Sequence, residues 1–481
     1  MATRARTAAG PRVCIAVPDG DLAAALGRAL AARGIDSAVA ATLPDAVASG
    51  AAAIAFCPTD APAPAAAAEL AATCARAVGA GQAVVMLAVY PPARGDDAAE
   101  RAAALAYLRA HGAVLCADPD VWLETLALIS VYGLPAGPRV AVVAPPRSWL
   151  ALAATALAAE RADGADRPAA LVPDAARVGP ADVALVDRAE LPADAPARVG
   201  RALIVPVVGR AEHLAGGRRI PLVGLREALA AAAAAGRAAA RVAAGLGPAD
   251  RADADALDPD PERFARQLDQ LDHRAGDHET KVLLASWGVR ITRQAVATTP
   301  SAATRLAKRA GFPVQLKPWS ADAPAETAGC PVETDLRNAP DVRRAFAAVG
   351  KAAGLPAGAP VIVRETPPPG REVAAELRRR GALGWTVVLR VPGAPGPVAA
   401  PGPLRPLDAE RLARYVEASR STDPEPDREA LAELLLRASH MVATHDDAFD
   451  RLDLDRVVVA ARGDGAVVVD ARAALRHPRR G

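Results

Sequence analysis

Aromatic residues, paired cysteines and runs of one-signed charge are all scarce in this chain of 481 residues. Aromatic side chains make up 3% of the residues, which argues against the stacking platforms that hold single-stranded nucleic acids. The formal net charge is only +2, and lysine and arginine are spread along the chain without a basic stripe. A nucleic-acid partner is therefore not expected.

Cysteine and long apolar runs are the other two features in short supply. The five cysteines show neither a CxxC pair nor metal-ligand spacing; they are Cys14, Cys57, Cys74, Cys116 and Cys330. A sparse, odd set of this kind fits reduced thiols and predicts a cytoplasmic protein. No apolar run is long enough to cross a bilayer without charges or prolines, and residues 1–10 lack an apolar signal core. We expect no membrane partner, and a disordered tail over residues 1–10.

What the chain does contain is enough apolar surface for several packed domains. Hydrophobic residues make up 52% of it, and its length suggests about three domains. Over residues 11–137, short apolar runs such as RVCIAV, AAAIAFC and AVVMLAVY alternate with helical segments, with Asp118 or Asp120 as a candidate helix cap. This pattern predicts a flavodoxin-like α/β domain with a parallel sheet.

A second, shorter α/β unit is predicted over residues 138–245. It starts with the apolar run RVAVVAPP and ends in a long alanine-rich helix over residues 225–244. Residues 246–262 are polar, acidic and proline-bearing, which predicts an interdomain linker before a last domain over residues 263–481. Within that domain, residues 392–406 are rich in proline and glycine and are expected to form a long loop.

One lysine stands out at the start of the last domain. The pattern predicts a helix ending at Trp287, a short strand over Val289–Thr292, a second helix over Ser301–Ala310 and then a buried strand that carries Lys317. A lysine at the end of an apolar strand is costly to bury unless an anion meets it, and a nucleotide phosphate is the obvious candidate. A lone lysine of this kind can also be a surface side chain whose amine reaches water.

Two aspartates near the C-terminus form a second candidate site. The segment RLDLDRVVVAARGDGAVVVDARAAL contains Asp464-Gly465, a strong hairpin signal, with Asp455 before it and Asp470 after it. Such a hairpin would bring the two carboxylates side by side on paired strands. Two oxygen ligands suit a Mg²⁺ ion that keeps waters and bridges nucleotide phosphates. Aspartates that flank a hairpin are also often simply solvated.

In this order, the elements resemble the ATP-grasp module of the ADP-forming acyl-CoA synthetases, which are succinyl-CoA-ligase-like enzymes. The resemblance implies an α/β protein with two flavodoxin-like, parallel-sheet domains followed by an ATP-grasp domain. It further implies an acid–thiol ligase of the ADP-forming acyl-CoA synthetase type, with ATP and Mg²⁺ as cofactors and CoA or an acyl-CoA as a further partner. Lys317 would bind the nucleotide, and Asp455 and Asp470 would bind the metal.

Other site residues follow from the resemblance alone. The family's glycine-rich phosphate loop aligns with AETAGCPV, which leaves Thr327 and Gly329 as its phosphate partners. Pro331 stands where the family has a glycine, and it removes an amide donor. PPPGREVAAELRRR resembles another strand of the family and places Glu372 near its acidic nucleotide-binding position.

The catalytic elements of the family are where the sequence departs from it. The family's phosphohistidine loop aligns with PPARGDD, Pro91 to Asp97, which contains no histidine, and His111 lies one predicted helix later. No GxGxxG fingerprint follows the first strand, so the family's CoA-binding domain is not expected in this chain. No catalytic residue can therefore be assigned, and activity is expected to be impaired.

Three functional hypotheses follow. The first is an ATP-grasp acyl-CoA synthetase homologue, with a partner chain that supplies the CoA-binding domain and the histidine. The second is a non-catalytic binding or regulatory subunit of a synthetase-like complex. The third, an unrelated α/β binding protein, requires the order of the motifs to arise by chance. The acyl substrate is not identified by any of these patterns.

Overall fold

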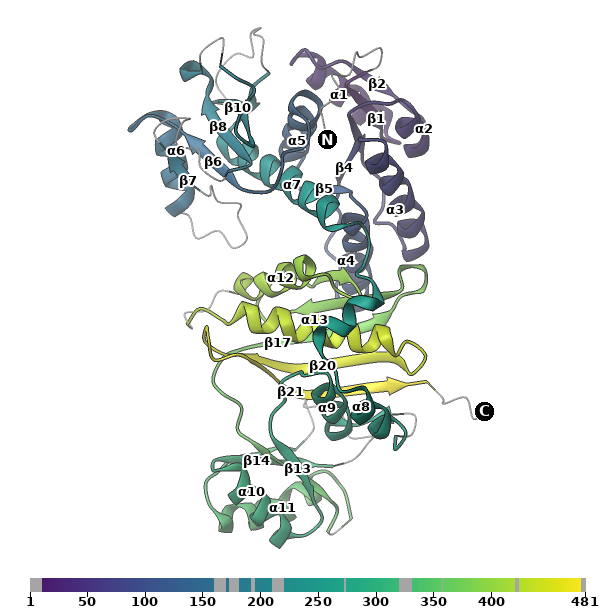
Figure 1. The fold of residues 1–481 in the computed structure, drawn as a ribbon, viewed down its shortest axis with the longest axis vertical. Coiled ribbons are helices and arrows are strands. Elements are labelled where there is room, and N and C mark those ends of the chain that lie inside the picture. Colours follow the sequence, from purple (N-terminus) through teal and green to yellow (C-terminus); the bar gives the residue numbers. More distant parts are fainter. Residues whose placement is uncertain are drawn as a thin grey trace. The chain divides into compact units, whose positions relative to one another are not determined.

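The computed structural model describes residues 11–159, 170–172, 181–191, 195–209, 220–271, 274–319, 331–356, 358–419 and 424–476. The chain divides into two compact units (Figure 1). The first unit comprises Met1–Ala93 with Ala104–Gly247, and the second comprises Arg94–Ala103 with Pro248–Gly481. The expected tail over residues 1–10 and the candidate phosphate-loop residues Thr327 and Gly329 lie outside the described residues.

The first unit begins with a parallel sheet in the strand order β2-β1-β3-β4-β5. Its strands are β1 (Val13–Ala16), β2 (Ser37–Val39), β3 (Ala53–Phe56), β4 (Ala83–Leu87) and β5 (Val114–Cys116). The helices of this part are α1 (Gly20–Ala31), α2 (Leu43–Ala48), α3 (Pro64–Gly79), α4 (Gly95–Ala110), of which residues 95–103 belong to the second unit, and α5 (Pro119–Tyr132). The strand order is that of flavodoxin-like folds, which confirms the predicted parallel α/β architecture. Of the two candidate caps, Asp118 caps α5, since its carboxylate accepts from the backbone N–H groups of Asp120 and Val121.

A second sheet follows in the order β11-β10-β8-β6-β7, with β9 added antiparallel to β10. Its strands are β6 (Val140–Val143), β7 (Ala170–Val172), β8 (Val183–Asp187), β9 (Arg198–Val199), β10 (Ala202–Val208) and β11 (Leu222–Val223). The helices are α6 (Trp149–Ala159), the 3-10 turn η2 (Arg188–Glu190) and α7 (Leu225–Ala244). One hydrophobic core runs from Val13 to Ala238, so the two sheets of this unit share their packing.

The second unit contains a large antiparallel sheet in the order β12-β21-β20-β17-β18-β19. Its strands are β12 (Arg274–Ala275), β17 (Arg371–Arg379), β18 (Trp385–Arg390), β19 (Val398–Pro401), β20 (Phe449–Val459) and β21 (Ala466–Leu475). The helices and 3-10 turns of this part are η3 (Arg251–Leu257), α8 (Pro261–Leu268), α9 (Asp277–Ser286), η4 (Gly381–Leu383), α12 (Pro406–Arg414), η5 (Tyr415–Ala418) and α13 (Arg428–Thr444). Apolar residues of α8, α9, α12 and α13 pack with the strands in one core.

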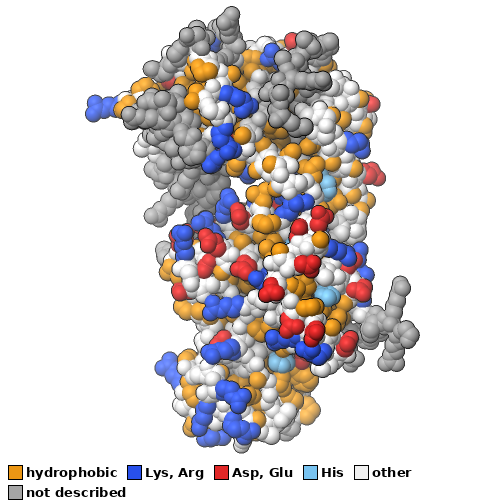
Figure 2. Space-filling view, in the orientation of Figure 1, with side chains coloured by type: hydrophobic (Ala, Val, Ile, Leu, Met, Phe, Trp, Pro, Cys, Tyr) orange, Lys and Arg blue, Asp and Glu red, His pale blue; other side chains and the backbone are white. Residues whose placement is uncertain are grey.

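A small antiparallel sheet, in the order β13-β16-β14-β15, forms the other part of the second unit. Its elements are β13 (Gln294–Ala297), α10 (Pro300–Ala310), β14 (Val314–Pro318), β15 (Glu333–Leu336), α11 (Ala339–Ala352) and β16 (Val361–Glu365). Its core is separate from that of the large sheet. Figure 2 shows basic side chains gathered over the end of the molecule where α10 and α11 lie.

Three expectations about local structure differ from what is observed. Residues 289–292 form an isolated parallel bridge instead of a strand: Ile291 pairs with Val468 of β21 through backbone hydrogen bonds of Arg290 and Thr292. The expected loop over residues 392–406 contains β19, which pairs with β18. The segment 246–262 includes η3, whose Ala254 is buried in the core of the large sheet. None of the described helices is long and apolar enough to span a bilayer.

Candidate functional site

Lys317 lies where the small sheet meets the large one. β14 carries it with five buried residues in a row, and the lysine itself is 4% exposed. Its Nζ atom is 2.5 Å from Oδ1 of Asp470, on β21 of the large sheet, and 2.9 Å from Oδ2 of Asp277, in the first turn of α9. The amine is therefore held between two carboxylates from distant segments, and it does not reach out to water as a surface lysine would.

Arg364 binds the same oxygen of Asp470 from the neighbouring strand of the small sheet. It lies in β16 and is fully buried. Its Nη1 atom donates to Asp470 Oδ1 at 2.8 Å and to the backbone carbonyl of Val469 at 3.2 Å, while its Nε atom donates to Gln315 at 2.8 Å. The guanidinium thus joins two strands of the small sheet to β21 of the large sheet.

Lys281 is the third buried cation of the group. Its amine, 0% exposed, donates to Thr292 Oγ1 at 3.0 Å and to the carbonyl of Val469 at 2.6 Å, and it lies 3.2 Å from Asp277 Oδ2. Burial lowers the pKa of Lys281 to about 8, and the charges of Lys317 and Arg364 act in the same direction. The five side chains of Lys281, Lys317, Arg364, Asp277 and Asp470 are called the inter-sheet cluster below.

The ionisation states within the inter-sheet cluster follow from its charges. Burial opposes charging of Lys317, but the carboxylates of Asp277 and Asp470 raise the pKa of this amine above its ordinary value. Burial likewise tends to raise the pKa of Asp470, yet the charges of Arg364 and Lys317 hold it well below its usual range. At neutral pH the lysine is therefore cationic and the aspartate anionic.

Asp455 lies on β20, at an irregularity in its pairing with β21 that places Arg456 opposite Asp470. One of its oxygens accepts from Arg472 at 3.0 Å. The pKa of Asp455 is raised to about 6, chiefly by burial; the charge of Arg472 opposes this rise, and the charges of Asp453 and Asp470 contribute to it. The proximity of two carboxylates on paired strands agrees with the expectation from the hairpin, whose turn lies between β20 and β21.

These two aspartates have the donor atoms that a divalent cation requires. Oδ2 of Asp455 and Oδ2 of Asp470 are buried and accept no hydrogen bond within the described part of the chain. A hard cation that binds through one or two carboxylates, waters and phosphate oxygens fits such a pair. Among the described residues no group of three or more His, Cys, Asp or Glu could hold a metal ion by itself, so waters and phosphate oxygens would complete the shell.

The remaining predicted residues are not part of the inter-sheet cluster. Glu372, on β17, is half exposed, and its carboxylate pairs with Arg456 at 2.5 Å. His111 directs Nδ1 to the carbonyl of Tyr107 at 2.8 Å and lies against that tyrosine ring, which is a structural arrangement. Asp96 and Asp97 lie in the first turn of α4.

Sequence reasoning missed Asp277, Lys281 and Arg364. Two of the three carry the signal that identified Lys317, a cation in an apolar stretch: Lys281 in TKVLLASW and Arg364 in PVIVRE. Asp277 has only its i,i+4 spacing to Lys281, a pattern that is common on exposed helix faces. The contacts of all three with β21 arise from tertiary structure.

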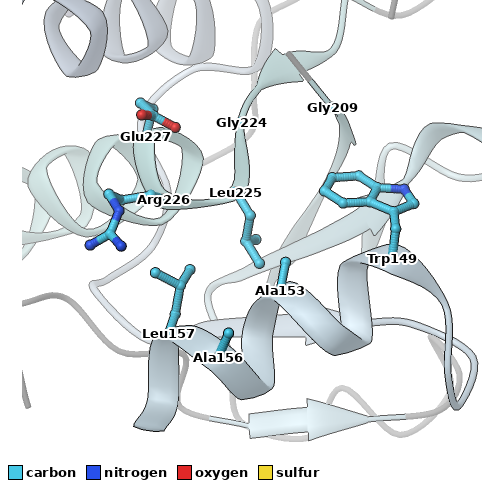
Figure 3. A pocket seen from close by; sticks show the side chains of 9 residues that line it. All are labelled: Trp149, Ala153, Ala156, Leu157, Gly209, Gly224, Leu225, Arg226 and Glu227. Atoms are coloured by element: carbon cyan, nitrogen blue, oxygen red, sulfur yellow. The ribbon is translucent and has the colours of Figure 1, made fainter. Parts of the chain in front are cut away.

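A separate cavity of about 550 Å³ lies in the first unit (Figure 3). Side chains of α6 form one wall, and Gly209 and the first turn of α7 form the other; the lining residues are Trp149, Ala153, Ala156, Leu157, Gly209, Gly224, Leu225, Arg226 and Glu227. None of the predicted site residues lines it.

Comparisons with known proteins agree with this geometry. Residues 266–475 match the family model described as an ATP-grasp domain. A 215-residue stretch is 24% identical to acetate–CoA ligase (ADP-forming) II subunit beta of Pyrococcus furiosus, over 42% of this chain and 91% of that protein. The match confirms the predicted ATP-grasp module and its resemblance to ADP-forming acyl-CoA synthetases.

Two of the similar solved structures are those of proteins from Pyrococcus horikoshii and Ca. Korarchaeum cryptofilum. A crystal structure of a Pyrococcus horikoshii Ot3 protein is 22% identical, with a TM-score of 0.42, over 45% of this chain and 99% of that one. A structure of Ca. Korarchaeum cryptofilum ACD1 in complex with coenzyme A is 25% identical, with a TM-score of 0.40, over 45% of this chain and 100% of that one.

Replacing Asp455 by asparagine is expected to stabilise the protein at pH 7. The folded-state pKa of about 6 lies above the ordinary 3.8, so the folded state binds more protons between these values and wild-type stability falls as pH rises through that window. Asparagine keeps an acceptor for Arg472 and removes the buried charge. Urea unfolding followed by circular dichroism should show a gain of up to about 3 kcal/mol at pH 7.

The gain should shrink toward zero below about pH 3, where the wild-type carboxyl is neutral in both states. Asp450→Asn is the matched control on the same strand, because its side chain is 57% exposed. An Asp455→Asn variant that is no more stable than wild type at pH 7 would contradict the raised pKa of the buried Asp455 carboxyl.

Proposed function

We propose that this chain, in which residues 266–475 form an ATP-grasp domain, binds ATP together with Mg²⁺ at the inter-sheet cluster. The observation that carries the proposal is the buried contact between Lys317 of the small sheet and Asp470 of the large sheet, at 2.5 Å. ATP-grasp domains hold a nucleotide between two such sheets, and these two residues come one from each.

The chemistry of the cluster suits a phosphate group. Lys317 is buried and cationic, and a phosphate oxygen is an anion that could replace Asp470 as its partner without leaving the amine uncompensated. Asp455 and Asp470 would then hold the divalent cation through their buried Oδ2 atoms. When bound, the cation supplies charge neutralisation to the phosphates, while the protein side chains fix their position.

The acid–thiol ligase activity is a further step, taken from the relative, which is named as the beta subunit of an acetate–CoA ligase. By this resemblance the chain would take part in ADP-forming synthesis of an acyl-CoA from an acid and CoA. The segment 91–97 contains no histidine to carry the phosphoryl group, so we propose that the chain alone is impaired. A partner chain with a histidine and a CoA-binding domain would restore the relay.

A non-catalytic role is the second candidate. The absence of a histidine from PPARGDD favours it, because the loss of a nucleophile removes the route from ATP to an acyl phosphate. In this case the chain is a nucleotide-binding or regulatory subunit of a synthetase-like complex, which works in the cytoplasm. Both candidates require nucleotide binding, and they differ in turnover.

Lys317→Met is expected to weaken MgATP binding by about 10- to 100-fold, the usual worth of a charged hydrogen bond. The methionine keeps most of the volume of the lysine stem and removes the amine that would meet the phosphate. Isothermal titration calorimetry of the purified chain with MgATP measures the effect. Lys308→Met is the matched control, because Lys308 is exposed on α10, the helix that packs against the same small sheet.

Equal affinities of wild type and Lys317→Met would place the nucleotide elsewhere. A wild-type chain that takes up no MgATP would overturn the proposed function itself. Thermal melting of both variants separates a binding defect from a folding defect.

The isolated chain is expected to form no acyl-CoA from ATP, CoA and short-chain acids, because it offers no imidazole at the position of the phosphohistidine. Incubation with γ-labelled ATP and Mg²⁺ should leave the protein unlabelled. Asp96 and Asp97 are the only carboxylates in that segment that could accept a phosphoryl group. Both lie in the first turn of α4, where their ordinary role is to stabilise the start of the helix. Stable label that is lost in Asp96→Ala or Asp97→Ala would show catalysis by another nucleophile.

A further inference from the structure

Arg364 is one of three members of the inter-sheet cluster, with Asp277 and Lys281, to which the proposed function gives no role. It follows three apolar residues of β16 and is fully buried, and a buried charge is costly unless it has a partner or a function. Its Nη1 atom and Lys317 Nζ both contact Oδ1 of Asp470, at 2.8 and 2.5 Å. The guanidinium is therefore a direct neighbour of both residues assigned to phosphate and metal.

The charge of Arg364 cannot be removed by a proton transfer. A buried lysine can become neutral, as the lowered pKa of Lys281 indicates, whereas a guanidinium stays protonated in proteins. Its fixed positive charge acts through a poorly screened interior, where neighbouring charges interact strongly. It must attract an arriving phosphate and repel an arriving metal cation.

We propose that Arg364 is a specificity-determining residue that biases this site toward nucleotide phosphate and against a free divalent cation. The inference rests on the proposed nucleotide function of the same site. With Lys317 and Arg364 both on Oδ1, Asp470 has two cations on one oxygen, and only Oδ2 remains for a metal. A metal ion approaching alone meets both positive charges, whereas a metal ion bound to phosphates arrives with its charge already balanced. The cation therefore enters together with the nucleotide.

A purely structural role for Arg364 makes a different prediction. Its bonds to Gln315 and to the carbonyl of Val469 tie β14 and β21 together, so its loss could loosen the site. Loosening would weaken phosphate and metal binding alike. The charge effect instead changes the two affinities in opposite directions, and this difference in sign separates the two roles.

The test uses Arg364→Met and Arg364→Gln in the full chain, with two separate titrations. Mn²⁺ without nucleotide is measured by the loss of its free paramagnetic resonance signal, and ATP without metal is titrated in EDTA by calorimetry. We expect Mn²⁺ to bind about tenfold more tightly and metal-free ATP about tenfold more weakly than to wild type. Arg364→Lys keeps the positive charge but not the planar guanidinium, and its affinities for Mn²⁺ and for ATP should stay within about threefold of those of wild type.

Arg437→Met is the matched control. Like Arg364, this arginine donates to backbone within the second unit, in its case to the carbonyls of Leu257 and Trp287, but it lies outside the inter-sheet cluster. Joint loss of both affinities, or no change in either, would overturn the proposal. If Arg364→Met and Arg364→Gln fail to fold, the test rests on Arg364→Lys. Loss of ATP affinity in Arg364→Lys, which keeps the positive charge, would contradict a role that depends on charge. A wild-type chain that binds no ATP would contradict the proposed function. The Mn²⁺ titration would still show whether the charge of Arg364 weakens the binding of a free divalent cation.

Discussion

The contact between Lys317 and Asp470 is the constraint on which the C-terminal unit depends. It joins the last part of β14 to the middle of β21, and Arg364 and Asp277 complete the group from β16 and α9. Removing two charges from water costs several kcal/mol per ion, and their attraction returns this only when the geometry is good. An apolar pair would hold two sheets together at least as well. A charged group at this position is better explained by ligands that need its charges.

The same group contains the charges that nucleotide binding requires. Lys317 and Asp470 supply opposite charges from the two sheets, and Asp455 supplies a second carboxylate on the adjacent strand. All three residues are present in the sequence, and the fold brings them close together. The segment Pro91–Asp97 has no histidine, and this is the reason for our proposal that turnover is impaired in the chain alone. Binding of the cofactor and turnover therefore have separate physical requirements. The charged residues described here correspond to the first of these, which is nucleotide binding.

The sequence was informative where a residue conflicted with its local pattern. A lysine in an apolar strand identified Lys317, and the Asp-Gly turn placed Asp455 and Asp470 on paired strands. The alternating apolar runs predicted both parallel sheets of the first unit. Arg364 carried the same signal as Lys317, but no motif pointed to it. Asp277 could not be found, because its role depends on α9 packing beside β21. The strand expected at residues 289–292 is reduced to an isolated bridge between Ile291 and Val468.

Amide hydrogen exchange of the full chain, with and without a non-hydrolysable MgATP analogue, tests the central claim most directly. Backbone amides exchange more slowly where a ligand stabilises the local structure. The account predicts slower exchange in β14 (Val314–Pro318) and β21 (Ala466–Leu475), which carry Lys317 and Asp470. Unchanged exchange in both strands, or protection confined to the residues that line the cavity in Figure 3, would contradict it.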